Sequence, residues 1–80
     1  MDLLFIVHAE EDMAERAISE AEVREALAHP FDIAPGHVRG RMTYDANVGG
    51  RGIRVVVEDG TDPLVVVAVM FRRLTREHRS

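Results

Sequence analysis

The segment from Ser19 to Pro30 constrains the fold of this chain more than any other. Ser19 and Glu22 have the spacing of a capping box, in which each side chain accepts a hydrogen bond from the other residue's backbone amide. Ile18, before the cap, and Val23, at the fourth helical position, are spaced as a hydrophobic staple. Pro30 disfavours a helical conformation at the residue before it. The segment therefore predicts a helix that begins after Ser19 and ends before Pro30.

One narrow face of this helix is apolar at helical spacing and is expected to point inward; it consists of Val23, Ala26 and Leu27. A second, shorter helix is expected just before it, with an acidic first turn that the helix dipole favours. Asp12 and Arg16 are spaced to pair on its outside. Its inner stripe, at positions i, i+4 and i+8, consists of Ala9, Met13 and Ala17.

Four strands are expected, one before the helices and three after them, at residues 2–7, 38–45, 53–58 and 64–71. The first is a continuous apolar run that ends at His8, and such runs are typical of strands covered on both faces or central in a sheet. The last is apolar on both faces and is expected to be the most buried. The remaining segments are expected to be a connector at 31–36, a hairpin loop at 47–52 and a polar tail at 72–80.

This pattern predicts one α+β domain over residues 1–80, in the order β-α-α-β-β-β, with an antiparallel sheet packed on two helices. Two amphipathic helices cover only one face of such a sheet. The other face is either solvated or covered by the tail or by a partner. A function is therefore to be sought on that face.

Composition limits the functional classes. Eighty residues form one modest core, so self-association is expected to add to a marginal stability. The absence of cysteine excludes disulfides and thiolate metal sites and fits a cytoplasmic location. No apolar run is long enough to span a membrane, and the start lacks the basic region of a secretory signal. No cofactor is expected, and no metal site either, because His8 and Asp12 at i, i+4 lack a third ligand.

Charge divides the chain into two halves. Residues 1–40 carry nine acids and three bases, a charge of −6, whereas residues 41–80 carry five acids and seven bases, a charge of +2. All ten of these bases are arginine. The forked donor geometry of the arginine guanidinium suits phosphate binding. The codon bias of a GC-rich genome would also produce a chain with arginine in place of lysine.

Several short motifs follow one another in a recognisable order. They are His8-Ala9, Arg-x-Ile-Ser at 16–19, Glu-Val-x-x-x-Leu before a proline at 22–30, Gly-Arg before Tyr at 40–44, and Ile-Arg-Val-Val-Val at 53–57. In these motifs the chain resembles an uncharacterised-domain family of the RelE-like toxin superfamily, from Val7 to Arg73. The ending, residues 71–77, is similar to that of BrnT toxins.

The resemblance implies an endoribonuclease that works without metal. In such enzymes a base activates the ribose 2′-hydroxyl, cations stabilise the phosphorane and an acid protonates the leaving oxygen. Histidine titrates near neutral pH and suits the acid or base role. The catalytic candidates are His8, Arg41, Arg54 and Arg73. The RNA-binding candidates are Arg39, Arg72 and Tyr44.

Each candidate also has a structural role open to it. His8 can bond a backbone carbonyl at the strand end or cap the first helix, and Tyr44 can be a core residue. Arg41 and Arg54 are expected to lie opposite each other if the hairpin centres near residues 47–48; they would then repel unless an anion lies between them or an acid pairs with one of them. Glu58, Asp45 and the helix acids are the available partners, and Arg72 and Arg73 can simply be the solvated end of a strand.

Two functions therefore stay open. The first is a toxin-like ribonuclease that acts on RNA. The second is a non-catalytic domain whose uncovered sheet face binds a protein partner, either an antitoxin-like chain or its own copy. Converging, exposed His8, Arg41 and Arg54 would favour the first, whereas the same groups paired with Asp and Glu would argue against it.

Overall fold

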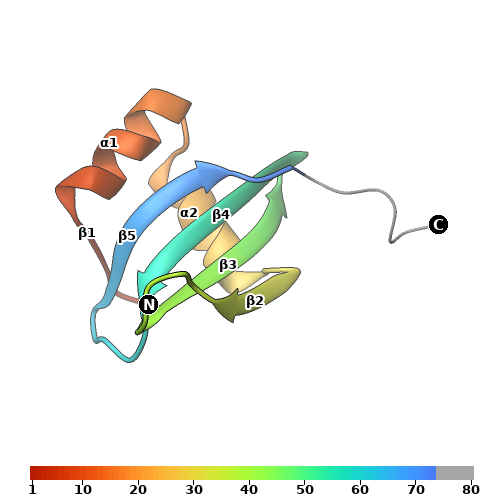
Figure 1. The fold of residues 1–80 in the computed structure, drawn as a ribbon. Helices are drawn as coiled ribbons and strands as arrows, with labels where there is room; N and C mark the ends of the chain where they lie inside the picture. Colours follow the sequence, from red (N-terminus) through yellow and green to blue (C-terminus); the bar gives the residue numbers. More distant parts are fainter. Residues whose placement is uncertain (74–80) are drawn as a thin grey trace.

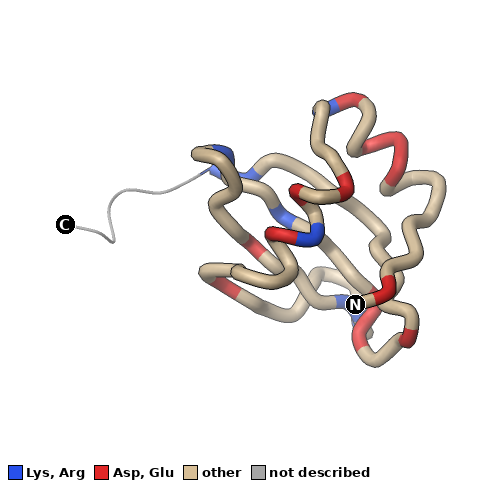
Figure 2. The backbone as a smooth tube through the Cα atoms, turned by 180° about the vertical axis from the view of Figure 1, so that it is seen from behind, with Lys and Arg blue, Asp and Glu red and all other residues tan. Residues whose placement is uncertain are grey.

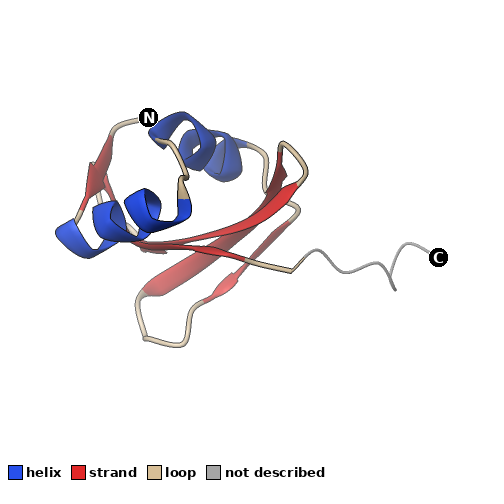
Figure 3. Cartoon of the chain, turned by 90° about the horizontal axis from the view of Figure 1, so that it is seen from above, coloured by secondary structure: helices blue, strands red, loops and turns tan. Residues whose placement is uncertain are grey.

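The computed structural model describes residues 1–73 and has two helices on one face of a five-stranded sheet (Figures 1 and 3). Residues 74–80, which form most of the predicted polar tail, lie outside the described part. The α+β class is confirmed. In chain order the elements are β1 (Leu3–Phe5), α1 (Val7–Arg16), α2 (Glu20–Ala28), β2 (Asp32–Pro35), β3 (Arg41–Val48), β4 (Arg51–Glu58) and β5 (Leu64–Phe71).

The sheet is mixed, with the strand order β1-β5-β4-β3-β2. β1 pairs in parallel with β5, and all other pairs are antiparallel. The expectation of a central or doubly covered first strand is therefore wrong, because β1 lies at an edge and Leu4 is 53% exposed. The strand is also shorter than predicted, since α1 begins at Val7 and takes in His8.

β2 is a strand that the sequence analysis assigned to a connector. It pairs with β3 so that Ile33 lies opposite Tyr44 and Pro35 opposite Met42. Proline lacks an amide donor and is tolerated in a strand at the edge of a sheet. Pro35, the last residue of β2, is thus compatible with a short edge strand.

The hairpin between β3 and β4 turns at Gly49 and Gly50, which have φ values of 59° and 85°. A two-residue turn with positive φ at both positions matches the twist of a hairpin. The turn sets a register in which Asp45 lies opposite Arg54 and Arg41 lies opposite Glu58. The prediction that Arg41 and Arg54 face each other is therefore wrong.

The second helix agrees with its prediction. The Ser19 amide donates to Glu22 Oε1 at 2.8 Å, and the Glu22 amide donates to Ser19 Oγ at 3.1 Å. The predicted inner face is buried against the sheet, where residues of β3, β4 and β5 complete the core. The buried residues of this core cluster are Val23, Ala26 and Leu27 from α2, and Ala46, Val48, Ile53, Val55, Val57, Val66 and Val69 from the sheet.

The first helix agrees only in part. Ala9 is fully buried and Met13 packs against the core. Ala17 is exposed, because it is the C-cap of α1 and adopts a left-handed conformation with φ 53°. Asp12 is buried instead. Its pair with Arg16 forms, but the carboxylate lies on an inner side of the helix, not on the outside as predicted.

Candidate functional site on the open sheet face

The face of the sheet opposite the two helices, called the open face below, carries most of the predicted site arginines. The register pairs Thr43 with Val56 and Val56 with Ala68, and cross-strand neighbours lie on the same side of a sheet. Side chains two residues apart share that side. The open face of the three long strands therefore includes Arg41, Thr43 and Asp45 from β3, Arg54, Val56 and Glu58 from β4, and Ala68 and Met70 from β5.

A hollow of about 210 Å³ lies on the open face. Its apolar lining comes from Val38, Val56, Ala68 and Met70, and its polar lining from His37, Arg41, Thr43 and Arg54. The turn after β2 closes one side, because the Gly36 amide donates to the Arg41 carbonyl at 2.8 Å and the Arg41 amide donates to the Val38 carbonyl at 3.2 Å. The hollow is thus a mainly apolar cup with a basic border.

His37 lines the hollow but is not among the predicted site residues. The Pro35-Gly36 pair before it indicates a turn. Because a connector was expected in place of β2, nothing in the sequence indicated that this turn brings the chain back over β3.

Asp45 holds two of the predicted arginines. It is 1% exposed and lies on the open face. Its carboxylate accepts from Arg54 Nε at 2.8 Å and from Arg54 Nη2 at 3.0 Å, and Arg72 donates to the same group. The hydrogen bonds to Asp45 raise the pKa of Arg54 above its ordinary value. The guanidinium groups of Arg54 and Arg72 thus have an acid partner within the domain.

Arg41 is paired as well. Its Nε donates to Glu58 Oε2 at 3.0 Å, directly across the β3–β4 ladder. Both side chains are 36% exposed. Each of these arginines therefore has a carboxylate partner, and Arg54 and Arg72 share one between them.

The remaining candidates lie elsewhere. Arg39 is exposed in the turn before β3, and Arg73 is exposed just after β5. Tyr44 is on the helix-facing side of the sheet, where it packs against the core. These three side chains do not line the hollow.

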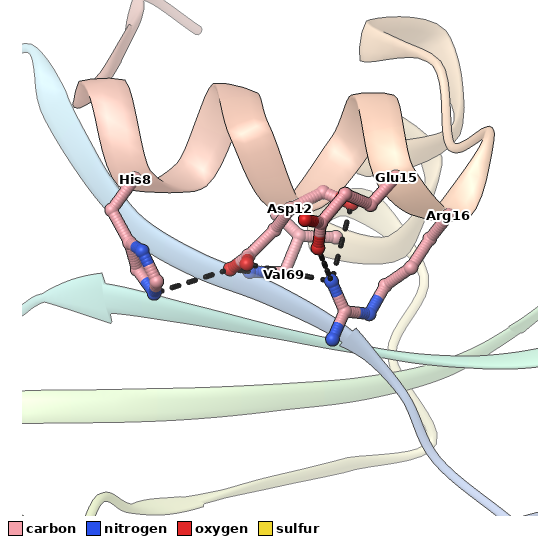
Figure 4. Close-up of polar contacts among 5 residues, drawn as sticks. All are labelled: His8, Asp12, Glu15, Arg16 and Val69. Atoms are coloured by element: carbon pink, nitrogen blue, oxygen red, sulfur yellow. Dashed lines mark hydrogen bonds and ion pairs between the residues drawn. The ribbon is translucent and has the colours of Figure 1, made fainter.

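His8 belongs to a separate cluster on α1 (Figure 4). Its Nε2 is 3.7 Å from Asp12 Oδ2, and Arg16 Nη1 is 3.4 Å from Asp12 Oδ1. Asp12 Oδ2 also accepts from the Val69 amide of β5 at 3.1 Å. Within residues 1–73, no hydrogen bond or ion pair joins His8 to Arg41 or Arg54. The predicted catalytic set is therefore split between two places.

The helix side of the domain is acidic. The two helices carry seven acids and two arginines, and Figure 2 views the backbone from this side with the acids in red. Like charge repels an anionic polymer over about a Debye length, roughly 8 Å at physiological salt. Of the two sides, only the open face is thus electrostatically suited to an anionic ligand.

Residues 1–73 contain no helix long and apolar enough to cross a membrane. They also contain no cluster of three or more histidines and carboxylates arranged to hold a metal ion.

Comparison with known proteins gives one result. Residues 5–71 match the model of a family described as Domain of unknown function (DUF4258). No curated protein and no solved structure matches the chain. Because the matched segment is most of the 80 residues, the chain belongs to the DUF4258 family.

Proposed function

We propose that this domain is a non-catalytic binding module that takes an apolar side chain of a partner polypeptide into the hollow on its open face. The observation that carries the proposal is the chemistry of the hollow. Its lining is mainly apolar, and the arginines at its border are paired with Asp45 and Glu58. Such a surface gains free energy by covering apolar area and leaves little charge to be neutralised.

Size supports a side chain as the occupant. Pockets that bind small molecules and cofactors measure roughly 300–1,000 Å³, whereas this hollow measures about 210 Å³. An anchor residue inserted into a pocket of the partner is the usual centre of a protein interface.

Charge supports an acidic neighbour beside that anchor. His37 lines the hollow, and Arg39 follows it in the same turn; both are exposed, and neither forms an ion pair among residues 1–73. The partner chemistry that fits is therefore an apolar residue flanked by Asp or Glu. We propose a separate, antitoxin-like chain as its source, in a cytoplasmic setting that a cysteine-free chain tolerates.

The order of the elements supports a place in the RelE-like superfamily, which we propose as the wider relationship of the fold. Two helices precede an antiparallel set of strands, as that resemblance implies. The partner-binding proposal does not depend on this relationship.

A ribonuclease is the second candidate, favoured by one observation. His37, Arg41 and Arg54 line the same hollow, so a titratable group and two cations share one concave site. RNA would have to draw Arg41 and Arg54 away from Glu58 and Asp45. Because Asp45 is buried, losing its arginine partner would be costly, so we rank this candidate second.

A random peptide-display library is the probe for the first proposal. Selection on the purified domain is expected to enrich peptides with an apolar residue beside an acid. Ala68→Arg should fill the hollow and weaken the binding of these peptides at least about tenfold. Loss of an interface anchor costs on the order of 1.4 kcal/mol or more of binding free energy. Ala14→Arg is the matched control, since Ala14 is exposed on α1. Enriched peptides that bind both variants equally would refute the site.

Cleavage of an RNA pool and of translating ribosomes tests the second candidate, with His37→Ala, Arg54→Ala and His8→Ala beside the unaltered protein. Cutting that is lost in folded His37→Ala and Arg54→Ala but kept in His8→Ala would make the hollow a nuclease site and overturn the non-catalytic proposal. Cutting lost only in His8→Ala would move the activity to α1. An absence of cutting in both settings would leave the binding module as the remaining candidate.

A further inference from the structure

The two edges of the sheet formed by residues 1–73 differ in chemistry. β2 and β1 are the edge strands, of four and three residues. Edge strands resist pairing with other chains when they carry charges or proline. β2 carries Asp32 and Pro35, whereas β1 consists of Leu3, Leu4 and Phe5. Of these two protective features, charge and proline, only the β2 edge has either, and the β1 edge is limited by its short length alone.

The outer side of β1 presents unpaired backbone groups at alternate residues. On its inner side, the Asp2 carbonyl accepts from the Leu64 amide at 3.0 Å, and the Ile6 amide donates to the Val66 carbonyl at 3.2 Å. The even-numbered residues thus face β5. In a parallel strand both polar groups of a residue point to the same side, so those of Leu3 and Phe5 point away from the sheet.

Apolar side chains surround this edge. Leu3 and Phe5 pack against the core, while Leu4 points to the open face. The exposed fractions are 74% for Met1, 53% for Leu4, 37% for Ile6 and 68% for Val7. Figure 1 shows β1 at the margin of the sheet, beside β5.

We propose that β1 pairs antiparallel with β1 of a second copy of this chain, centred on Leu4. Two outward-facing residues define the register. Leu3 lies opposite Phe5 of the partner subunit, and Phe5 opposite Leu3 of the partner subunit, and each such pair exchanges two backbone hydrogen bonds. Leu4 then lies opposite its own copy in a pair without hydrogen bonds, with the two side chains in contact on the open face.

The distribution of charge permits this register. The central positions, residues 3–5, carry no charged side chain. Asp2 lies opposite Ile6 of the partner subunit, so the two Asp2 carboxylates lie at opposite ends of the ladder. Like charges directly across a ladder, which destabilise pairing, are therefore avoided. The contact is short and so falls among the small, weak interfaces.

Sedimentation of the full chain tests the pairing. The mean mass is expected to rise from monomer toward dimer as concentration increases from about 10 μM to about 1 mM, the range in which a weak interface associates. Leu4→Lys should keep the protein monomeric, because two ammonium groups would meet at the centre. Ile33→Lys is the matched control on the β2 edge, since Ile33 is 50% exposed, and should still dimerise.

A single introduced cysteine tests the register without relying on Leu4→Lys, and the chain has no other cysteine. Residues in a pair without hydrogen bonds have Cα atoms about 4.5 Å apart, within the range of a disulfide. Leu4→Cys should therefore oxidise to a covalent dimer faster than Ile33→Cys. A monomer at every concentration, or a dimer in which Ile33→Lys and not Leu4→Lys reduces the mass, would overturn the proposal. Equal oxidation of the two cysteine variants would also overturn it.

Discussion

Asp45 and Arg54 lie opposite each other on β3 and β4 and are joined by two hydrogen bonds, of 2.8 and 3.0 Å. Arg72, just beyond β5, donates to the same carboxylate. Two arginines far apart in the sequence thus share one buried acid. This cluster is the main polar anchor of a face that is otherwise built around an apolar hollow.

Asp45→Ala is expected to destabilise the domain by about 3 kcal/mol, the low end for removing one partner of a buried ion pair. The low end applies because Arg54 and Arg72 are 27% and 34% exposed and regain some hydration. Urea denaturation measures the loss. Asp59→Ala, at an exposed turn, should change stability little. A loss of stability in Asp45→Ala as small as that in Asp59→Ala would show that the Asp45 cluster does not stabilise the fold.

Asp12→Ala is expected to expose the Val69 amide to exchange. The Asp12 carboxylate accepts from that amide at 3.1 Å, and an unpaired buried donor costs about 1–3 kcal/mol. Hydrogen exchange followed by NMR should show faster exchange at Val69 in Asp12→Ala. Asp12→Asn, which keeps an acceptor oxygen, should stay closer to the unaltered protein. Unchanged protection of Val69 in Asp12→Ala would contradict the assigned role.

Glu22 is expected to contribute an acid-sensitive part of the stability. Hydrogen bonds from the Ser19 amide and from Arg51 lower the pKa of Glu22 below its ordinary 4.5. The unfolded chain thus takes up the proton first, so the contribution is complete above pH 4.5 and is lost as pH falls toward the folded-state pKa. The stability difference between the unaltered protein and Glu22→Gln should therefore shrink below pH 4.5 in denaturation experiments. A difference that stays constant or grows there would refute the linkage.

Two isoleucines provide a matched test of the core. Ile53 is fully buried, whereas Ile33 is 50% exposed at the β2 edge. Ile53→Ala is expected to cost about 2–5 kcal/mol, the range for emptying a buried position, and Ile33→Ala much less. Thermal and urea unfolding measure both. Similar losses would mean that Ile33 is covered in solution, for example by a partner at β2.

Local patterns in the sequence predicted the local structure well. The capping box at Ser19 and Glu22 and the inner face of α2 needed no knowledge of the rest of the chain, because helix caps and helical spacing are properties of a few neighbouring residues. The inner stripe predicted for α1 was right at Ala9. It was wrong at Ala17, because the helix ends there in a left-handed C-cap.

Pairings between distant segments were harder to predict. Residues 47–52 contain three glycines, so several hairpin centres were compatible with the sequence. The structure turns at Gly49-Gly50, the pair that a two-residue hairpin turn prefers. That choice decides whether Arg54 faces an arginine or Asp45, so an error in the turn changed the chemistry of the predicted site. The position of His8 could not be predicted either, because it depends on where β1 ends and α1 begins.

The parallel pair of β1 with β5 has a consequence for folding. It joins Leu3 to Leu64, so the first and last strands must meet before the sheet is complete. Closing a long loop is slow compared with forming a hairpin such as β3–β4. During synthesis, β1 and the apolar side of α1 must wait for β5 to emerge from the ribosome, because both of them pack against β5. Until then β1, which consists of apolar residues, lacks its native partner, and nascent chains are most open to misassociation at this stage.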